Sequence, residues 1–475
     1  MNYLILINNA PDYREYFINL GAELKQRGHN IYYALDSRLT DYLYKEHRID
    51  NDVKIYFSDY FKTHYKTPLF AELESIPRNK ILFADKERFY FYPIHKDKLH
   101  DYWESLNVNL LNFFFEALTK YKIDVVLYEN VSNAFAYSAY LICQQMNKKY
   151  IGLASSRLPY DLFEIHTEID VSSSVVAAPL NLSDERVQIL NDYVLRVKNK
   201  SAQPAYMIGN TTSVKTNYLK RYFSMAKLNK FFKLIDYLIK ERNEIFYNFQ
   251  NGNPLLLSIY YAKRNLLRRI RLGFLQRYIC ASNKSDKFFL YPLHFHPEAS
   301  TSVLSPDYID EISLIRKISL SMPNGVFLYV KEHPNAFGYN TIDFYQQLKM
   351  LSNVKLIGYS ENTFDLIIRS IAVVTLTSTV GYEALLYNKP VIVFGDVFYK
   401  RFPGCYFFDR FASLEELFTT LLLESQLKKD QGSEVNIAII QQYLAFVVDG
   451  NLFINEKAEI EKVITSIEGF LGCKA

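Results

Sequence analysis

The stretch FFLYPLHFHPEAS, residues 288–300, begins the part of the sequence that decides the fold. Its first six residues form an apolar run typical of a buried strand. Further apolar runs lie at 326–331, 354–357, 372–376 and 391–394. Stretches with helical spacing separate them, at 307–322, 341–351, 361–370 and 381–387. Strands that alternate with helices in this way predict a doubly wound parallel sheet with right-handed crossovers.

The N-terminal half predicts a second unit of the same kind. Apolar runs suited to strands lie at 3–7, 31–35, 124–128 and 150–154. Helical spacing occurs at 13–27, 110–121 and 132–146, and Gly28 stops the first of these helices. The segment 55–105 is irregular and aromatic, so we expect an insertion or a loop-rich part there. The predicted fold class is α/β with two Rossmann-like lobes that face a cleft.

The composition is that of a folded multidomain protein. The chain has 475 residues, of which 49% are hydrophobic and 22% charged, and this excludes disordered and fibrous classes. We expect an N-terminal lobe at 1–200, a basic helical connector at 201–285 and a C-terminal lobe at 286–430. Residues 431–475 should form helices that return to the first lobe. With no signal-peptide pattern and no charge-free run of eighteen apolar residues, a cytoplasmic location is expected.

The connector region is strongly basic. Residues 215–277 hold fourteen Lys or Arg against three acids, a local charge of +11, whereas the whole chain carries +4. Apolar residues at helical spacing accompany the charge, for example Phe231, Phe232, Ile235 and Ile239. Two readings stay open, a peripheral contact with an anionic membrane surface and a solvated helical connector. No nucleic-acid-binding motif accompanies the charge, so nucleic acid is not an expected partner.

Three of the nine histidines, His294, His296 and His333, follow the ends of predicted strands. Ligands bind at that edge of open α/β sheets. In the two His-Pro steps the proline holds the preceding residue extended, so the imidazole is presented from a stiff turn. A fixed imidazole beside Lys331 suits a phosphate ligand. Because no metal-binding spacing completes the cluster, we expect no metal.

A third cluster, TLTSTVGYEAL at 375–385, runs from a strand directly into a helix. Ser378 or Thr379 can cap that helix, and its free N–H groups can bind a phosphate. Glu383 lies about one turn inside the helix, within reach of a ribose hydroxyl. The alternative is ordinary helix capping, with Glu383 favoured by the helix dipole.

Glu129 and Asn130 end a predicted strand of the N-terminal lobe and should face the cleft. A desolvated carboxylate there can act as base or nucleophile. Arg157, at the end of the next strand, can bind a sugar carboxylate. Capping or surface roles are the alternative for both positions. The motifs of dinucleotide oxidoreductases, P-loop NTPases, serine hydrolases and zincins are absent from the sequence, which argues against those classes. Asp50-Asn51-Asp52 matches the D-x-D of metal-dependent sugar transferases, but we interpret it as a surface loop.

The order KEHP at 331–334, TSTVGYEAL at 377–385 and KPV at 389–391 resembles the bacterial capsule polysaccharide biosynthesis glycosyltransferases. These include the Kdo transferases of capsule and O-antigen (lipopolysaccharide) assembly and, more distantly, the polysialyltransferases. The resemblance covers roughly residues 286–400. It implies a GT-B fold, with the donor nucleotide on the C-terminal lobe, the acceptor on the N-terminal lobe and no cofactor.

The resemblance also implies a CMP-activated ulosonic acid donor, such as CMP-Kdo or a CMP-nonulosonic acid. Lys331, His333, Ser378 and Thr379 would then contact the donor, and Glu129 would stand where a catalytic carboxylate is expected. We predict His296 and Glu383 as further donor ligands, and His294 and Glu298 in catalytic roles. The N-terminal lobe lacks the acidic pair followed by Gly of the polysialyltransferases, which argues against sialic acid as the donor sugar.

Two other functions remain open from the sequence. One is a UDP-sugar-dependent transferase or epimerase of the same fold. The other is a non-catalytic component that docks a capsule assembly complex to the membrane through residues 215–277. The partners expected for the leading prediction are a nucleotide-sugar donor and a glycan or lipid-linked glycan acceptor.

Overall fold

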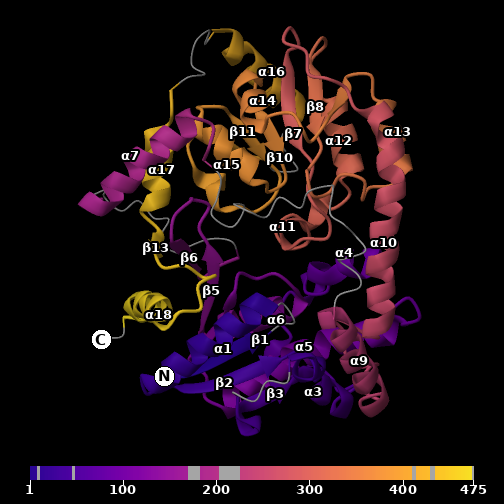
Figure 1. The fold of residues 1–475 in the computed structure, drawn as a ribbon, viewed down its shortest axis with the longest axis vertical. Coiled ribbons are helices and arrows are strands. Elements are labelled where there is room, and N and C mark those ends of the chain that lie inside the picture. Colours follow the sequence, from indigo (N-terminus) through magenta and orange to yellow (C-terminus); the bar gives the residue numbers. More distant parts are fainter. Residues whose placement is uncertain are drawn as a thin grey trace.

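The computed structural model describes residues 1–7, 11–44, 49–169, 182–202, 225–408, 413–427 and 434–472. They form two α/β lobes, one above the other in Figure 1, with the N-terminal lobe in indigo and the C-terminal lobe in orange. The predicted fold class is therefore confirmed. The first part of the basic segment, up to residue 224, and Cys473 lie outside the described residues.

The sheet of the N-terminal lobe has the order β13-β6-β5-β4-β1-β2-β3. Its strands are β1 Asn2–Ile7, β2 Asn30–Leu35, β3 Lys54–Tyr56, β4 Val125–Glu129, β5 Lys149–Ser155, β6 Leu162–His166 and β13 Val447–Asp449. The strands from β3 to β5 are parallel, whereas β6 and β13 join one edge antiparallel. Helices cover the sheet, so most residues of the inner strands are apolar and β1 is buried from Tyr3 to Ile7.

The helices of this lobe are α1 Pro11–Gln26, α2 Leu39–Tyr44, α3 Phe57–Thr63, α4 Phe83–Phe91, α5 His100–Lys120, α6 Ala134–Gln145 and α18 Lys457–Leu471. The expectation of a loop-rich segment at 55–105 was wrong in part, because α3, α4 and the start of α5 lie there. These helices are short, and their aromatic residues pack on other elements, as Phe57 and Phe61 do on α5. Helices with so few turns do not show a helical period in the sequence.

The sheet of the C-terminal lobe has the order β12-β11-β10-β7-β8-β9, and every pairing is parallel. Its strands are β7 Phe288–Pro292, β8 Phe327–Lys331, β9 Val354–Ile357, β10 Val373–Thr375, β11 Val391–Val393 and β12 Cys405–Phe407. Its helices are α11 Ala299–Ser302, α12 Glu311–Leu320, α13 Ile342–Lys349, α14 Thr363–Arg369, α15 Thr379–Leu386 and α16 Leu414–Leu427. The strand order turns back between β7 and β10, which makes their carboxyl ends the switch point where ligands bind in such sheets.

Among the described residues, helices connect the lobes at two places. At the first, α7 (Asp184–Lys198) and α17 (Ile437–Leu444) pack with α15, and Tyr193, Tyr382 and Tyr443 share one apolar cluster. That cluster joins residues on both sides of the expected boundary at residue 200. Helices α9 (Met225–Lys240) and α10 (Pro254–Leu275) lie along the right side of Figure 1, where α10 reaches from the lower lobe to the upper one. Within the described part of the chain, no helix combines the length and apolarity needed to span a bilayer.

Candidate functional site

The switch point of the C-terminal sheet is occupied by His294. It follows β7, and its Nε2 accepts a hydrogen bond from the backbone N–H of Thr377, which follows β10, at 3.3 Å. Its Nδ1 lies 3.0 Å from Oε1 of Glu311, the first residue of α12. Both ring nitrogens therefore have protein partners, and His294 joins the two central strand ends to α12. In this arrangement it positions the loop rather than offering a free base.

His296, two residues on, connects the two lobes. Its Nε2 lies 2.8 Å from Oε2 of Glu311, and its Nδ1 lies 2.5 Å from Oε1 of Glu87 on α4 of the N-terminal lobe. Thr301 donates a hydrogen bond of 2.6 Å to the other oxygen of Glu87. The imidazole, both carboxylates and Thr301 are buried. One side chain of the C-terminal lobe is thus held by a carboxylate from each lobe.

The charges in this cluster follow from its hydrogen bonds. Burial by itself lowers the pKa of His296, but the hydrogen bonds to Glu311 and Glu87 outweigh it and raise the pKa to about 10. Burial opposes ionisation of Glu311, yet His294 and His296 together hold its pKa well below the usual range. His296 is therefore a cation that donates from both nitrogens to carboxylates. Neither nitrogen is left for a donor phosphate unless one of these bonds opens.

Lys331 and His333 lie at the end of the neighbouring strand, β8. Lys331 is buried, its Nζ is 3.4 Å from the carbonyl oxygen of Tyr359, and burial lowers its pKa. The pKa of His333 falls to about 4, because of burial and because His294 and Lys331 lie nearby. The ring is therefore neutral at pH 7. Its Nδ1 accepts a hydrogen bond of 3.2 Å from the backbone N–H of Asn335, so the proton is on Nε2. His333 thus has an N–H suited to a phosphate oxygen.

The helix start after β10 has the predicted form. Ser378 is the N-cap of α15, and its Oγ accepts from the N–H of Val380 at 3.2 Å. Thr379 is the first helical residue and is half-buried. Burial raises the pKa of Glu383 to about 8, although Lys331 nearby lowers it. Lys331 and His333 after β8 and the α15 start after β10 therefore lie at the same edge of the sheet, on either side of β7.

A cavity of about 630 Å³ lies between the lobes and contains Glu129. Its walls come from α4, the end of β4, helix α10 and the loop after β7: Arg88, Tyr92, Glu129, Ser132, Asn133, Gln250, Asn251, Leu257, Tyr261, Arg264, Asn265, Phe295, Pro297, Ala299 and Tyr339. Ser132 donates a hydrogen bond of 2.9 Å to Glu129, and burial raises the pKa of the Glu129 carboxyl. Phe295 reaches from this cavity toward His333, with ring centroids 6.3 Å apart. Phe295 therefore lines the cavity and also contacts the strand-end cluster.

The remaining predicted residues lie in different surroundings. Arg157 forms an ion pair of 2.6 Å with the buried Glu164 and stacks on the ring of Phe398 at 4.6 Å. Binding a sugar carboxylate there would compete with this pair. The Oδ1 of Asn130 accepts from the N–H of Val131 at 2.8 Å, within its own loop. Glu298 lies just before α11, is exposed, and accepts a hydrogen bond from Ser300 at 3.1 Å.

Four side chains that matter here were not predicted from the sequence. Glu87 and Arg88 come from the segment at 55–105, where no period was visible. Glu311 lies within a predicted helix, at 307–322, but no signal in the sequence links it to His294. Arg264 donates to the hydroxyl of Tyr92 at 2.6 Å and to the carbonyl oxygen of His296, and its basic surroundings suggested only a charged face. Among the residues that the structure describes, no group of three or more His, Cys, Asp or Glu is placed to hold a metal ion.

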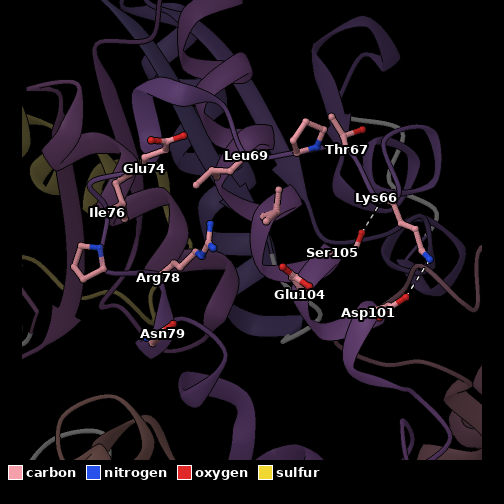
Figure 2. A pocket seen from close by; sticks show the side chains of 13 residues that line it. Lys66, Thr67, Leu69, Glu74, Ile76, Arg78, Asn79, Asp101, Glu104 and Ser105 are labelled. Carbon is pink, nitrogen blue, oxygen red and sulfur yellow. Dashed lines mark hydrogen bonds and ion pairs between the residues drawn. The ribbon is translucent and has the colours of Figure 1, made fainter.

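A further cavity, of about 900 Å³, opens in the N-terminal lobe (Figure 2). Lys66 pairs there with Asp101 at 3.1 Å, and Arg78, Glu74 and Glu104 bring further charges of both signs. None of the predicted site residues lines it. The D-x-D segment lines neither of these two cavities. Asp50 and Asp52 are exposed beside a short 3₁₀ turn, Asn51–Val53. The inter-lobe cavity with its strand-end cluster is therefore the candidate site.

Comparison with known proteins gives this site a family context. Residues 198–405 match the family model described as "Capsule polysaccharide biosynthesis protein". The resemblance predicted from the sequence is thereby confirmed for this segment. The match contains the strand ends after β7, β8 and β10, and therefore His294, Lys331 and Ser378. No curated protein matches the chain.

Solved structures offer only distant likenesses. The beta Kdo 2,4 transferase of Thermosulfurimonas dismutans KpsC is 13% identical with a TM-score of 0.36, over 73% of this chain and 87% of that chain. The beta Kdo 2,7 transferase of the same KpsC is 13% identical with a TM-score of 0.32, over 75% and 89%. A UDP-GlcNAc 2-epimerase of Methanocaldococcus jannaschii is 13% identical with a TM-score of 0.29, over 99% and 100%. Likenesses of this size do not assign an activity.

Proposed function

We propose that the protein is a glycosyltransferase of capsule or O-antigen polysaccharide synthesis that takes its sugar from a nucleotide donor. The observation that carries the proposal is the strand-end cluster of the C-terminal lobe, with its neutral His333 and its helix start at Ser378. Phe295 links this cluster to a cavity that contains Glu129 of the other lobe. A phosphate-binding edge and a carboxylate across a cleft are the two parts that sugar transfer needs.

In the proposed reaction, an acceptor hydroxyl attacks the anomeric carbon of the donor sugar, and the bond from that carbon to the phosphate oxygen breaks. Glu129 takes the hydroxyl proton, because burial raises its pKa toward the range where a carboxylate is a useful base. The Nε2–H of His333 binds the leaving phosphate, and the positive end of the α15 dipole favours its negative charge. Lys331 lies beside them as a cation and favours the developing negative charge.

The proposed donor is a CMP-activated ulosonic acid, such as CMP-Kdo or a CMP-nonulosonic acid. This part rests on the resemblance of the KEHP and TSTVGYEAL segments to the Kdo transferases of capsule assembly, which residues 198–405 support at the level of the family. The proposed partners are this donor and a glycan or lipid-linked glycan acceptor. The proposed place of work is the inner face of the cytoplasmic membrane.

Titration with CMP and with UDP, without added metal, tests the proposal directly. We expect CMP to bind more tightly than UDP. His333→Ala should weaken CMP binding by about tenfold or more, the size of one hydrogen bond to a charged group. Calorimetry measures the affinities, and thermal unfolding verifies that the variant is folded. His100→Ala is the matched control, because His100 is an exposed histidine of α5 far from the cluster.

The other outcomes are equally informative. Tighter binding of UDP would reject the CMP donor and favour a UDP-sugar transferase or epimerase, and turnover of donor without acceptor would favour an epimerase. Binding of neither nucleotide would reject the transferase. CMP binding that is the same in His333→Ala and in the wild-type protein would remove the phosphate role of His333.

A further inference from the structure

Helix α10 presents two different faces. On the inner face, Arg264 donates to Tyr92 of the N-terminal lobe and to the carbonyl oxygen of His296. Arg268 donates to the carbonyl oxygen of Phe337 at 2.7 Å, and Arg271 donates to that of Tyr339 at 3.0 Å. Arg264 thus joins the two lobes, and Arg268 and Arg271 attach α10 to the C-terminal lobe. Their role in the fold is internal.

The outer face of α10 is apolar and exposed. Ile259, Leu266, Ile270 and Phe274 expose 61%, 60%, 54% and 49% of their surface. Their spacing of seven, four and four residues places them on one side of the helix. We name these four residues the outer stripe of α10. Lys263, one turn after Ile259, is exposed as well. An exposed apolar stripe of this length on a surface indicates an interaction site.

We propose that the outer stripe of α10 docks the protein on an anionic lipid bilayer. Helix α10 has no acidic residue, and its Lys263 and Arg269 are exposed, so its outward charge is positive and complements anionic headgroups while the stripe enters the boundary between headgroups and acyl chains. The same absence of acids argues against a second copy of the chain as the occupant, since two α10 helices would bring the positive charges of Lys263 and Arg269 against those of their copies.

Helix α9 extends the same surface character. Leu228, Phe232 and Ile239 expose 45%, 62% and 74% of their surface, and Met225–Lys240 contains four lysines against one acid. The two helices are in contact, and both lie at the same side of the molecule in Figure 1. Apolar side chains and positive charge therefore recur over both helices of the insert, as an interfacial contact requires.

The docking has a consequence for the candidate site, and this consequence rests on the proposed function. Leu257, Tyr261 and Arg264 of α10 line the inter-lobe cavity, while the outer stripe lies on the other side of the same helix. Since an α-helix with its side chains is about 10–12 Å across, the cavity would lie about one helix diameter from the lipid headgroups. The acceptor would then be a lipid-linked glycan that enters from the bilayer beside α10.

Co-sedimentation with vesicles tests the docking without any donor or acceptor, so the result does not depend on transferase activity. Wild-type protein should bind vesicles of phosphatidylcholine with phosphatidylglycerol, bind phosphatidylcholine alone more weakly, and lose affinity as salt is raised. Leu266→Ser/Ile270→Ser should bind about tenfold more weakly, since two half-buried apolar contacts are lost. Lys263→Glu should weaken binding by about fivefold or more.

Matched controls and contrary outcomes are available in the same assay. Leu320→Ser/Leu423→Ser removes two leucines that are as exposed, on α12 and α16, and should bind like the wild type. The proposal is overturned if wild-type protein does not bind the anionic vesicles, or if both stripe variants bind as well as the control. It is also overturned if Leu228→Ser/Phe232→Ser on α9 abolishes binding while the α10 variants keep it. If the wild-type protein is a dimer and Leu266→Ser/Ile270→Ser is a monomer, the outer stripe binds a second copy of the chain and not a bilayer, and the proposal is overturned.

Discussion

Three histidines at one sheet edge have different partners, and His296 and His333 differ in charge for that reason. His296 lies between two carboxylates and is a cation, with a pKa of about 10. His333 is half-buried beside Lys331, its Nδ1 accepts a hydrogen bond from a backbone N–H, and its pKa is about 4. The Nδ1 of His294 is hydrogen-bonded to Glu311, and its Nε2 accepts a hydrogen bond from the backbone N–H of Thr377. The sequence places all three correctly at strand ends, yet only the partners decide which of them can bind a phosphate.

Glu129 is the residue on which the proposed chemistry depends. We expect Glu129→Gln to lower the turnover number of sugar transfer by about 100-fold or more, because the amide cannot accept the hydroxyl proton. Donor affinity should remain close to that of the wild type, since the carboxylate lies on the opposite lobe from the strand-end cluster. Steady-state kinetics that separate kcat from KM, together with CMP calorimetry, measure the two effects. Glu72→Gln, an exposed carboxylate of the same lobe, is the control. An equal loss of donor affinity and turnover would contradict the assignment.

At the scale of elements, the turns after β7, β10 and β11 pack closely on one another. Thr377 donates to the carbonyl oxygen of Ser300 at 2.7 Å, and the N–H of Asp396 donates to that of Leu304 at 2.8 Å. Gly395 lies between them, and a Cβ at this position would come within 2.9 Å of the Leu304 carbonyl oxygen. The site loop can therefore approach the sheet only because residue 395 has no side chain.

Gly395→Ala should lower the free energy of unfolding by about 1–3 kcal/mol, because the added methyl group meets backbone as well as side-chain atoms. The displaced loop carries His294 and His296, so CMP binding should weaken too. Denaturant unfolding and calorimetry measure both. Gly273→Ala on α10 is the matched control: its Cβ would have no neighbour within 4 Å, and the better helix propensity of Ala should leave stability unchanged or up to about 1 kcal/mol higher. Equal stability of the Gly395→Ala variant and wild type would show that the loop can move.

The elements differ in how far the sequence predicts them. Buried parallel strands appear as apolar runs, so β1, β4, β7, β8 and β10 could be located from the sequence within one or two residues. Helices α3 and α4 could not, because their apolar faces are set by contacts with α5 and with the 246–249 segment rather than by a long period. The Glu87–His296 pair could not be predicted either, since 209 residues separate its members. The candidate site was therefore predicted on the C-terminal lobe and largely missed where the other lobe completes it.

At the scale of the whole molecule, the pairing of His296 with Glu87 and Glu311 should make the association of the lobes pH-dependent. The pKa of His296 is about 10 in the folded protein and about 6.5 in an unfolded chain. The stability that this cation contributes is fully present below about pH 6.5 and is lost as the pH rises through about 10. Between these values the contribution falls by about 1.4 kcal/mol per pH unit.

The measurement compares the wild-type protein with His296→Gln in denaturant at pH 6.5 and at pH 9. The wild type should be more stable at the lower pH, and its advantage over the variant should shrink at the higher one. The pKa of Glu311 is lowered in the folded protein, so its contribution has the opposite pH dependence. This contribution to stability is present above the unfolded pKa of Glu311 and is lost as the pH falls through the folded pKa. His100→Gln should show the same difference from wild type at both pH values. An advantage that grows with pH would contradict the assigned charge state.

The antiparallel strand β13 and helix α18 come after the whole C-terminal lobe in the sequence, yet they belong to the N-terminal sheet and to the cover of α1. During synthesis on the ribosome, the first lobe must therefore wait with one sheet edge and part of its apolar surface uncovered until more than 440 residues have emerged. A chaperone that binds apolar surface would bind the first lobe during that interval. The two lobes, although each has its own sheet, reach their final folded state together.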